Sequence, residues 1–412
     1  MQLSLFAWEQ RKLLSCIEKI TDFRGRTPKK LGMDWSESGY LALSALNVKD
    51  GYIDFSQDVH YGEQALYDKW MSGNELHKGQ VLFTTEAPMG NVAQVPDNKR
   101  YILSQRTIAF DVKEDIITEN FLATLLRSPA VFNTLTSLSS GGTAKGVSQK
   151  SLAGVDIQIP VELREQELLA TYFANLDNLI TLHQRKYNKL LNVKKSMLEK
   201  MFPKNGSNIP EIRFKGFTDP WEQRKLGELA DIVGGGTPST GVSDYWDGDI
   251  DWYAPAEIAE QIYLTSSQRK ITEEGYNHSS AKMLPVGTVL FTSRAGIGKT
   301  AILTQKGCTN QGFQSIVPHK IELDSYFIFS RTEELKQYGE TVGAGSTFVE
   351  VSGKQMANME LMMPKTMAEQ KTIGQYFASL DNLITLHQRE LEKLQNIKKS
   401  ICLLYTSPSP RD

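Results

Sequence analysis

A glycine-rich segment in the second half of the chain carries the residue types of a phosphate-binding loop. Gly296-Ile297-Gly298-Lys299-Thr300 ends in a Gly-Lys-Thr that would hold phosphates with backbone N–H groups and a lysine. That loop also requires a glycine five residues before Gly298, where this chain has Ser293. We therefore interpret the segment as a turn at the end of a strand.

A second set of residues has the order of a metal-dependent nuclease site. Pro96-Asp97 is followed by Asp111 and Lys113, which gives two carboxylates for a metal ion and a lysine for phosphate. The pattern is short, and the second half of the chain has no counterpart. A nuclease that uses Asp97, Asp111 and Lys113 is therefore kept only as an alternative.

Other residues that could do chemistry lack the required spacing. Cys16, Cys308 and Cys402 have no metal-ligand spacing, and their small number favours a reduced, cytoplasmic protein. Neither a nucleophile elbow nor the Asn-Pro-Pro-Tyr loop of amino-methyltransferases is present. We expect a non-catalytic chain with no metal or cofactor of its own.

Composition and charge are those of an ordinary globular protein. The 412 residues are 40% hydrophobic and 23% charged, and no apolar run is long enough to span a membrane. The formal net charge of −2 argues against a broadly basic coat for nucleic acid. Local basic surfaces remain compatible with it, because binding depends on where the charges lie.

The dominant feature of the chain is an internal repeat. Leu-Asp-Asn-Leu-Ile-Thr-Leu-His-Gln-Arg occurs at 176–185 and again, 204 positions later, at 380–389. Trp-Glu-Gln-Arg-Lys-Leu likewise occurs at 8–13 and at 221–226. A period of this length indicates two domain-sized copies rather than a solenoid.

Each copy of the ten-residue stretch lies in a predicted long helix. Apolar residues recur at alternating steps of three and four, which is the spacing of a heptad seam. Two such seams in one chain would most simply pack against each other. His183 and His387 fall at equivalent seam positions, where we interpret them as polar residues that fix the register.

The segments before the helices predict two similar globules. Val81–Thr84 and Val289–Thr292 read as buried strands, and Gln105–Phe110 and Gln311–Val317 as the strands that follow. Short strands broken by Gly and Pro predict an α+β fold built around a twisted sheet. The expected order is a first globule at 1–160, a helix at 161–203, a second globule at 204–364 and a helix at 365–401. Residues 402–412 break the heptad and look like a translated sequencing adapter, so we treat them as a non-native tail.

These motifs resemble the specificity (S) subunit of type I restriction-modification enzymes over nearly the whole chain. The resemblance rests on the two repeated stretches, on Gly234-Gly235-Gly236-Thr237-Pro238 with the following Tyr245-Trp246, and on Asn310-Gln311-Gly312-Phe313. The first globule departs from this pattern, since it has only Arg26-Thr27-Pro28 and Trp35.

The resemblance implies a non-catalytic, DNA-reading subunit. Each globule would be a target recognition domain that reads one half of a bipartite site in double-stranded DNA. The helices would pair as an antiparallel coiled coil, set the gap between half-sites and dock two methylation subunits. Motor-nuclease restriction subunits would complete the complex, and the partners would bind S-adenosylmethionine, ATP and magnesium. They would also carry out adenine methylation and ATP-dependent cleavage.

If the chain functions as this resemblance implies, polar side chains on loops should contact the DNA. In the first globule the candidates are Arg24, Arg26, Lys29, Lys30, Thr143, Lys145, Ser148 and Lys150. In the second they are Thr237, Ser239, Arg294, Lys299, Thr347 and Lys354. On the helices, the candidate partner-binding residues are Leu176, Ile180, Leu190, Leu380, Ile384 and Leu391. The alternative from another class is a non-catalytic adaptor whose two globules bind proteins or glycans.

Overall fold

The computed structural model of the chain describes residues 7–57, 59–139, 146–204, 206–259, 261–294, 296–344 and 350–406. Residues 403–406 are described by their backbone only. Arg185–Gln388 form one compact unit, and the described residues on either side of this range form the other. Each unit therefore contains one globule together with part of both long helices.

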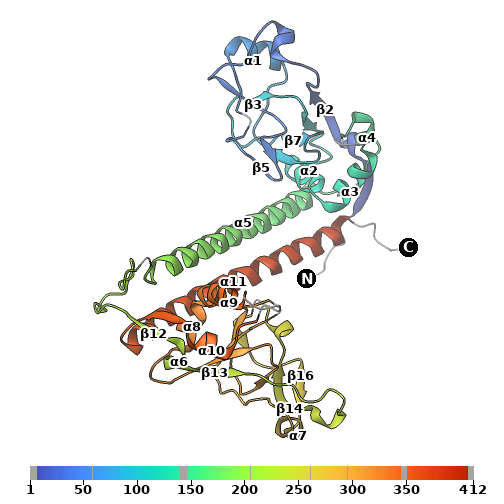
Figure 1. The fold of residues 1–412 in the computed structure, drawn as a ribbon. Helices are drawn as coiled ribbons and strands as arrows, with labels where there is room; N and C mark the ends of the chain where they lie inside the picture. Colours follow the sequence, from blue (N-terminus) through green and yellow to red (C-terminus); the bar gives the residue numbers. More distant parts are fainter. Residues whose placement is uncertain are drawn as a thin grey trace. The chain divides into compact units, whose positions relative to one another are not determined.

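The first globule is built on a four-stranded antiparallel sheet in the order β2-β10-β7-β8 (Figure 1). Its strands are β2 (Ile17–Asp22), β7 (Val81–Thr84), β8 (Val92–Gln94) and β10 (Thr107–Val112). Smaller sheets are formed by β3 (Tyr40–Leu43), β6 (Tyr61–Gly62) and β9 (Ile102–Leu103), and by β4 (Val48–Lys49) with β5 (Tyr52–Ile53). The helices are α1 (Gln64–Met71), α2 (Glu119–Leu126), α3 (Pro129–Leu138) and α4 (Gln149–Ala153).

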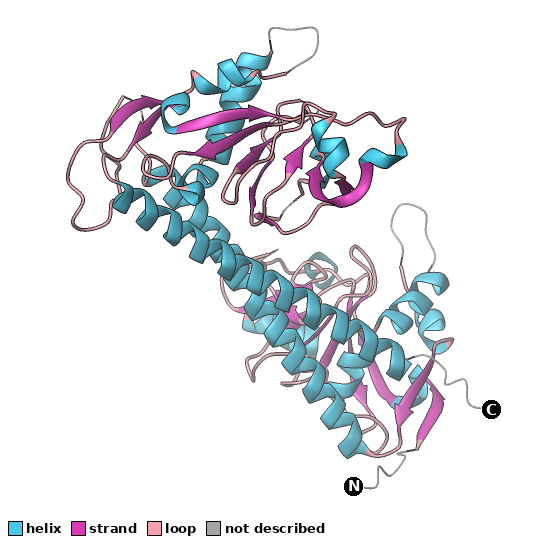
Figure 2. Cartoon of the chain, turned by 90° about the horizontal axis from the view of Figure 1, so that it is seen from below, coloured by secondary structure: helices cyan, strands magenta, loops and turns pink. Residues whose placement is uncertain are grey.

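The second globule repeats this framework. Its main sheet has the order β13-β20-β17-β18-β15, with β13 (Ala230–Gly234), β15 (Tyr263–Leu264), β17 (Val289–Phe291), β18 (Thr300–Leu303) and β20 (Gln314–Pro318). A smaller sheet holds β14 (Trp246–Tyr253), β16 (Arg269–Ile271) and β19 (Cys308–Thr309). Helices α6 (Leu226–Leu229), α7 (Glu273–Asn277), α8 (Ser325–Ser330), α9 (Thr332–Gly343) and α10 (Gly353–Ala357) complete it (Figure 1). Figure 2 shows that the chain combines helices and strands with many loops.

Strand β7 is buried on both faces, as its continuous apolar run predicts. Val81 and Phe83 point into a core lined by α2, whereas Leu82 points into a second core that contains Trp70 of α1. Successive strand residues face opposite sides of a sheet, so the sheet is covered on both sides. The predicted next strand begins two residues later than expected, at Thr107, because Gln105 and Arg106 belong to a loop.

The repeated Trp-Glu-Gln-Arg-Lys-Leu motif fastens each globule to its helix. Its strand, β1 (Trp8–Lys12) or β12 (Glu222–Lys225), pairs antiparallel with β11 (Asp156–Pro160) or β21 (Glu360–Met363), the last strand before the helix. The indole Nε1 of Trp8 donates to Glu165 at 3.2 Å, and that of Trp221 donates to the equivalent Glu369 at 3.2 Å. The motif therefore joins the beginning of each globule to the first turn of a long helix.

The long helices α5 (Leu163–Lys200) and α11 (Met367–Thr406) pack together in each unit (Figure 1). In the second unit, Lys194 pairs with Asp381 at 2.6 Å and the ring of Phe202 stacks on Phe377. From Lys194 to Phe202 the residue number rises, whereas that of the contacting residue falls from Asp381 to Phe377. The helices are therefore antiparallel. This confirms the α+β fold with two long paired helices that the repeat predicts.

The helix pair in the first unit uses the equivalent contacts. Phe173 and Leu176 of α5 pack with Leu394, Ile397 and Ile401, and with Cys402, which continues the helix and is buried. Lys398 pairs with Asp177 at 2.5 Å. Since Asp177 and Asp381 are 204 positions apart, as are Lys194 and Lys398, the two ion pairs are related by the repeat.

The aspartates of these ion pairs are expected to differ in their contribution to stability. Each aspartate has a second partner, since Asp381 accepts from the Tyr326 hydroxyl at 2.8 Å and Asp177 pairs with Arg127 at 2.9 Å, but the Asp381 side chain is 7% exposed and that of Asp177 is 23% exposed. Asp381→Ala should therefore lower the unfolding free energy by about 3 kcal/mol, and Asp177→Ala by about 1 kcal/mol. Calorimetry of the two variants tests the difference, and equal losses would contradict it.

Candidate nucleic-acid interface

The Thr-Pro loop of the first globule (residues 23–28) contains two of the predicted arginines, and both make internal contacts. Arg24 forms hydrogen bonds to the Asp22 carboxylate, the shortest at 2.6 Å, which raise the pKa of the guanidinium. It also donates to the Val147 carbonyl at 3.3 Å. Arg26 donates to the Trp70 carbonyl at 2.5 Å. These arginines hold the loop in place, so their charges are partly used within the globule.

Two lysines follow on a short 3-10 helix at 28–31. Thr27 caps this helix by accepting from the backbone N–H of Lys30 at 3.2 Å. The Lys30 ammonium donates to the Gly25 carbonyl at 2.6 Å, and both Lys29 and Lys30 are exposed. Of the four cations predicted at positions 24–30, Lys29 and Lys30 are therefore the most accessible to a phosphate backbone.

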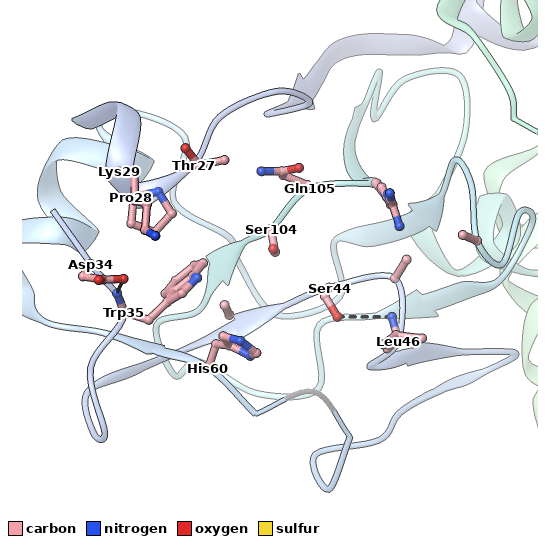
Figure 3. Close-up of a pocket in the computed structure, with 14 residues that line it drawn as sticks. Thr27, Pro28, Lys29, Asp34, Trp35, Ser44, Leu46, His60, Ser104 and Gln105 are labelled. Carbon is pink, nitrogen blue, oxygen red and sulfur yellow. Dashed lines mark hydrogen bonds between the residues drawn. The ribbon is translucent and has the colours of Figure 1, made fainter. Parts of the chain in front are cut away.

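A hollow of about 360 Å³ opens beside this loop (Figure 3). The rings of Trp35 and His60 lie 5.7 Å apart at its wall, and the hydroxyl of Ser44 accepts from the backbone N–H of Leu46. Its other polar lining residues are Asp34 and five residues from two segments that are distant in sequence: Thr27, Lys29, Ser104, Gln105 and Arg106. Hydroxyl, amide and guanidinium groups around one hollow suit hydrogen bonding to a polar ligand.

A glutamine joins these two loops in each globule. We use the name Gln loop for residues 104–106 and for the corresponding residues 310–312. The Gln105 side-chain amide donates to the Arg26 carbonyl, and the Thr237 hydroxyl donates to the Gln311 side-chain carbonyl. Neither glutamine was among the site residues predicted from the sequence, although their equivalent positions before β10 and β20 were a usable signal.

The Ser-x-Lys segments form the first turns of two short helices. Ser148 accepts from the backbone N–H of Ser151 at 3.1 Å, and Ser352 accepts from that of Gln355 at 3.2 Å. Each hydroxyl is thus a helix N-cap. Lys150 of α4 and Lys354 of α10 are exposed on these helices.

The remaining candidates of the second globule lie on two loops. Ser239 is exposed, and its carbonyl accepts from the Trp246 indole at 3.1 Å. Lys299 is exposed in the turn between β17 and β18, while Arg294 is half-buried and lies three residues after the end of β17. Candidates Thr143, Lys145 and Thr347 lie outside the described residues.

The phosphate-loop-like segment and the nuclease-like residues Asp97, Asp111 and Lys113 have other contacts in the structure. Gly296–Thr300 connects two antiparallel strands, whereas a phosphate-binding loop leads into a helix, which confirms the turn interpretation. Asp97 accepts from Tyr101, Asp111 accepts from Gln80, and Lys113 donates to a backbone carbonyl, so these groups have separate partners. Among the described residues, no cluster of three or more His, Cys, Asp or Glu could hold a metal ion.

The predicted partner-binding residues of the helices face mostly inward. Leu176, Leu380, Ile384 and Leu391 are 6–9% exposed, and Leu190 packs against the core of the second unit. Ile180 is half-buried. The outward faces carry other leucines, and these occur in repeat-related pairs: Leu179 and Leu383 at 43% and 44% exposed, and Leu182 and Leu386 at 46% and 52%. No helix within the described part of the chain is both long and apolar enough to cross a membrane.

Comparison with known proteins finds one family along most of the chain. The family described as "Type I restriction modification DNA specificity domain" matches residues 8–192 and again 218–396. The MjaIX specificity subunit of Methanocaldococcus jannaschii is 36% identical over 182 residues, which are 43% of this chain and 41% of that subunit. The putative MjaX specificity subunit of the same organism is 24% identical over 410 residues, 96% and 91% of the two chains.

A solved structure shares the fold over its full length. The crystal structure of a type I restriction-modification S subunit from M. genitalium aligns with a TM-score of 0.61 at 13% sequence identity. The alignment covers 99% of this chain and 99% of that one. The arrangement of two repeated globules and two long helices is therefore a known fold.

Proposed function

The chain belongs to the family of type I restriction-modification DNA specificity subunits, and we propose that each of its globules reads one half of a bipartite DNA target. The observation that carries this proposal is a shared framework with different loop chemistry. The four strands β2-β10-β7-β8 of the first globule correspond in order to β13-β20-β17-β18 of the second, whose sheet has β15 in addition, and in both globules a glutamine joins the same two loops. The groups at these loops differ, since Arg26 in the first globule is replaced by Gly236 in the second. A duplicated scaffold with divergent loops suits the reading of two different sequences.

The paired helices have two roles in this proposal: they set the gap between half-sites and dock two methylation subunits. Support for two equivalent docking sites comes from the outward leucines Leu179 and Leu182, which recur as Leu383 and Leu386. Apolar side chains exposed at helical spacing favour contact with a partner helix.

Catalysis in this proposal belongs to the partner subunits. Methylation subunits would bind S-adenosylmethionine and methylate adenine, and motor-nuclease subunits would use ATP and magnesium to cleave DNA. The S chain would bind no cofactor and would act in the cytoplasm. Its near-neutral charge then places the DNA-binding cations on local surfaces, such as Lys29 and Lys30.

A domain exchange tests the assignment of one globule to each half-site. Replacing Thr21–Ile157 with the corresponding segment of another S subunit should change one half of the methylated motif and leave the other half unchanged. The measurement is genome-wide mapping of methylated adenines in cells that carry the exchanged gene or the original one. A change in both halves, or no adenine methylation with the original gene, would contradict the proposal and favour the adaptor alternative.

A further inference from the structure

The backbone at the end of the central strand makes the same hydrogen bond in both globules. After β7, the N–H of Thr85 donates to the Arg106 carbonyl of the Gln loop at 2.8 Å. After β17, the N–H of Ser293 donates to the Gly312 carbonyl of the other Gln loop at 2.8 Å. Positions 106 and 312 are therefore equivalent, and so are the residues that follow Thr85 and Ser293.

We use the name junction for the place where the Gln loop meets the segment that follows the central strand. Each junction has one arginine, which the Gln loop supplies in the first globule and the segment after the strand supplies in the second. In the first globule, Arg106 of the Gln loop pairs with Glu86 at 2.9 Å, and these side chains are 55% and 42% exposed. In the second, Arg294 replaces Glu86, and the Gln loop has Gly312. A Cβ built on Gly312 would lie 3.6 Å from Nε of Arg294, so the guanidinium extends over that glycine. Both junctions thus present a guanidinium group, although the sequence positions differ.

The backbone of Arg106 indicates that its side chain has a use. Its φ is 64°, in the left-handed region that glycine and asparagine adopt more readily than arginine. The residue also lines the hollow beside the Thr-Pro loop. An exposed arginine thus has an unfavourable backbone conformation and lies at a hollow. From this we infer a functional role for its guanidinium group.

We propose that Arg106 and Arg294 each contact a guanine edge in their own half-site, which makes them specificity-determining residues. This inference rests on the proposed function. An arginine fork donates two hydrogen bonds to O6 and N7 of guanine in the major groove. In the first globule Glu86 can also accept from the cytosine amino group of the same base pair. In the second, the Gln loop has Gly312 in place of Arg106, and Glu350 lies opposite Arg294 across an isolated antiparallel bridge.

The carboxylate at the first junction argues for a base contact rather than a phosphate contact. Glu86 offsets the charge of Arg106 and would repel a phosphate close to the pair. A G·C edge, by contrast, has both acceptors for the arginine and a donor for the glutamate. Phosphate contacts are better assigned to Lys29 and Lys30, whose exposed ammonium groups have no carboxylate contact among the described ion pairs.

The test is to map methylated sites with the full-length chain in complex with its methylation subunits. The variants are Arg106→Asn, which suits the left-handed backbone, and Arg294→Ala. Arg106→Asn should relax one guanine position in one half-site, Arg294→Ala should relax one in the other, and each should slow methylation of the original site at least tenfold. Arg106→Lys and Arg294→Lys, which keep one charge but lose the fork, should retain an intermediate preference for guanine.

Each arginine variant serves as the control for the other half-site. Arg100→Ala is a further control, because Arg100 is exposed in the first globule but stacks over Tyr67, outside both loops. An unchanged motif in both arginine variants would overturn the inference, as would uniform weakening with no relaxed position. Absence of a bipartite motif with the unaltered chain would instead refute the proposed function.

Discussion

Replacing Leu176 and Leu380 together by aspartate should lower the thermal midpoint by about 6–12 °C and abolish docking of the methylation subunits. Both leucines are at least 93% buried where α5 and α11 pack together. An aspartate at either position loses the apolar contacts and places a carboxylate beside Asp177 or Asp381. We expect a cost of about 3 kcal/mol at each site, and each kcal/mol corresponds to about 2–4 °C for a unit of this size.

The repeat supplies a matched control for this experiment. Leu179 and Leu383 have the same residue type, lie in the same helices three residues later, and are 43% and 44% exposed. Leu179→Asp with Leu383→Asp should leave the thermal midpoint within about 2 °C, because an exposed aspartate loses little. The same variant should weaken docking of the methylation subunits if these leucines face them. Equal losses of stability in both double variants would show that the leucines do not differ in burial as described.

The elements of this chain were predictable where a pattern continues over many residues. The heptad spacing selected Leu176 and Leu380 as buried, and both are. The apolar run Val81–Thr84 predicted a buried strand, and all four residues of β7 are buried. In each case several residues repeat the same information, so one exception does not change the prediction.

The candidate site was less predictable, because its contacts join residues far apart in sequence. Arg24 and Arg26 have the right residue type for DNA, but no local pattern shows that Asp22 and the Trp70 carbonyl bind them. Gln105 became a site residue only through its contact with the Thr-Pro loop. The left-handed backbone of Arg106 is likewise set by the folded loop. The residue type alone therefore predicts the DNA-contacting residues less well than the contacts of each side chain in the folded structure do.

The antiparallel pairing of α5 and α11 allows a direct test of whether these helices set the gap between the two half-sites. Both helices contain the heptad Asn-Leu-Ile-Thr-Leu-His-Gln, at 178–184 in α5 and 382–388 in α11, and each copy ends where the two compact units divide. Duplicating both heptads keeps the phase of the seam and leaves the ion pairs Asp177–Lys398 and Lys194–Asp381 within their units.

Each added heptad lengthens its helix by about 10.5 Å, and one base-pair step of DNA is about 3.4 Å, so the gap in the methylated motif should grow by about three base pairs. Methylation should also slow, since three base pairs turn one half-site by about 100° around the DNA axis. A contrasting variant carries four extra residues between Asn192 and Val193 of α5 alone. Because this insertion changes the position of Val193 and Met197 relative to the rest of α5, it disturbs their packing against the core of the second unit. The variant should therefore be less stable to unfolding. Methylome sequencing with the duplicated heptads gives the gap and both half-sites together. An unchanged gap at full activity would mean that the helices act as flexible tethers and do not set the distance.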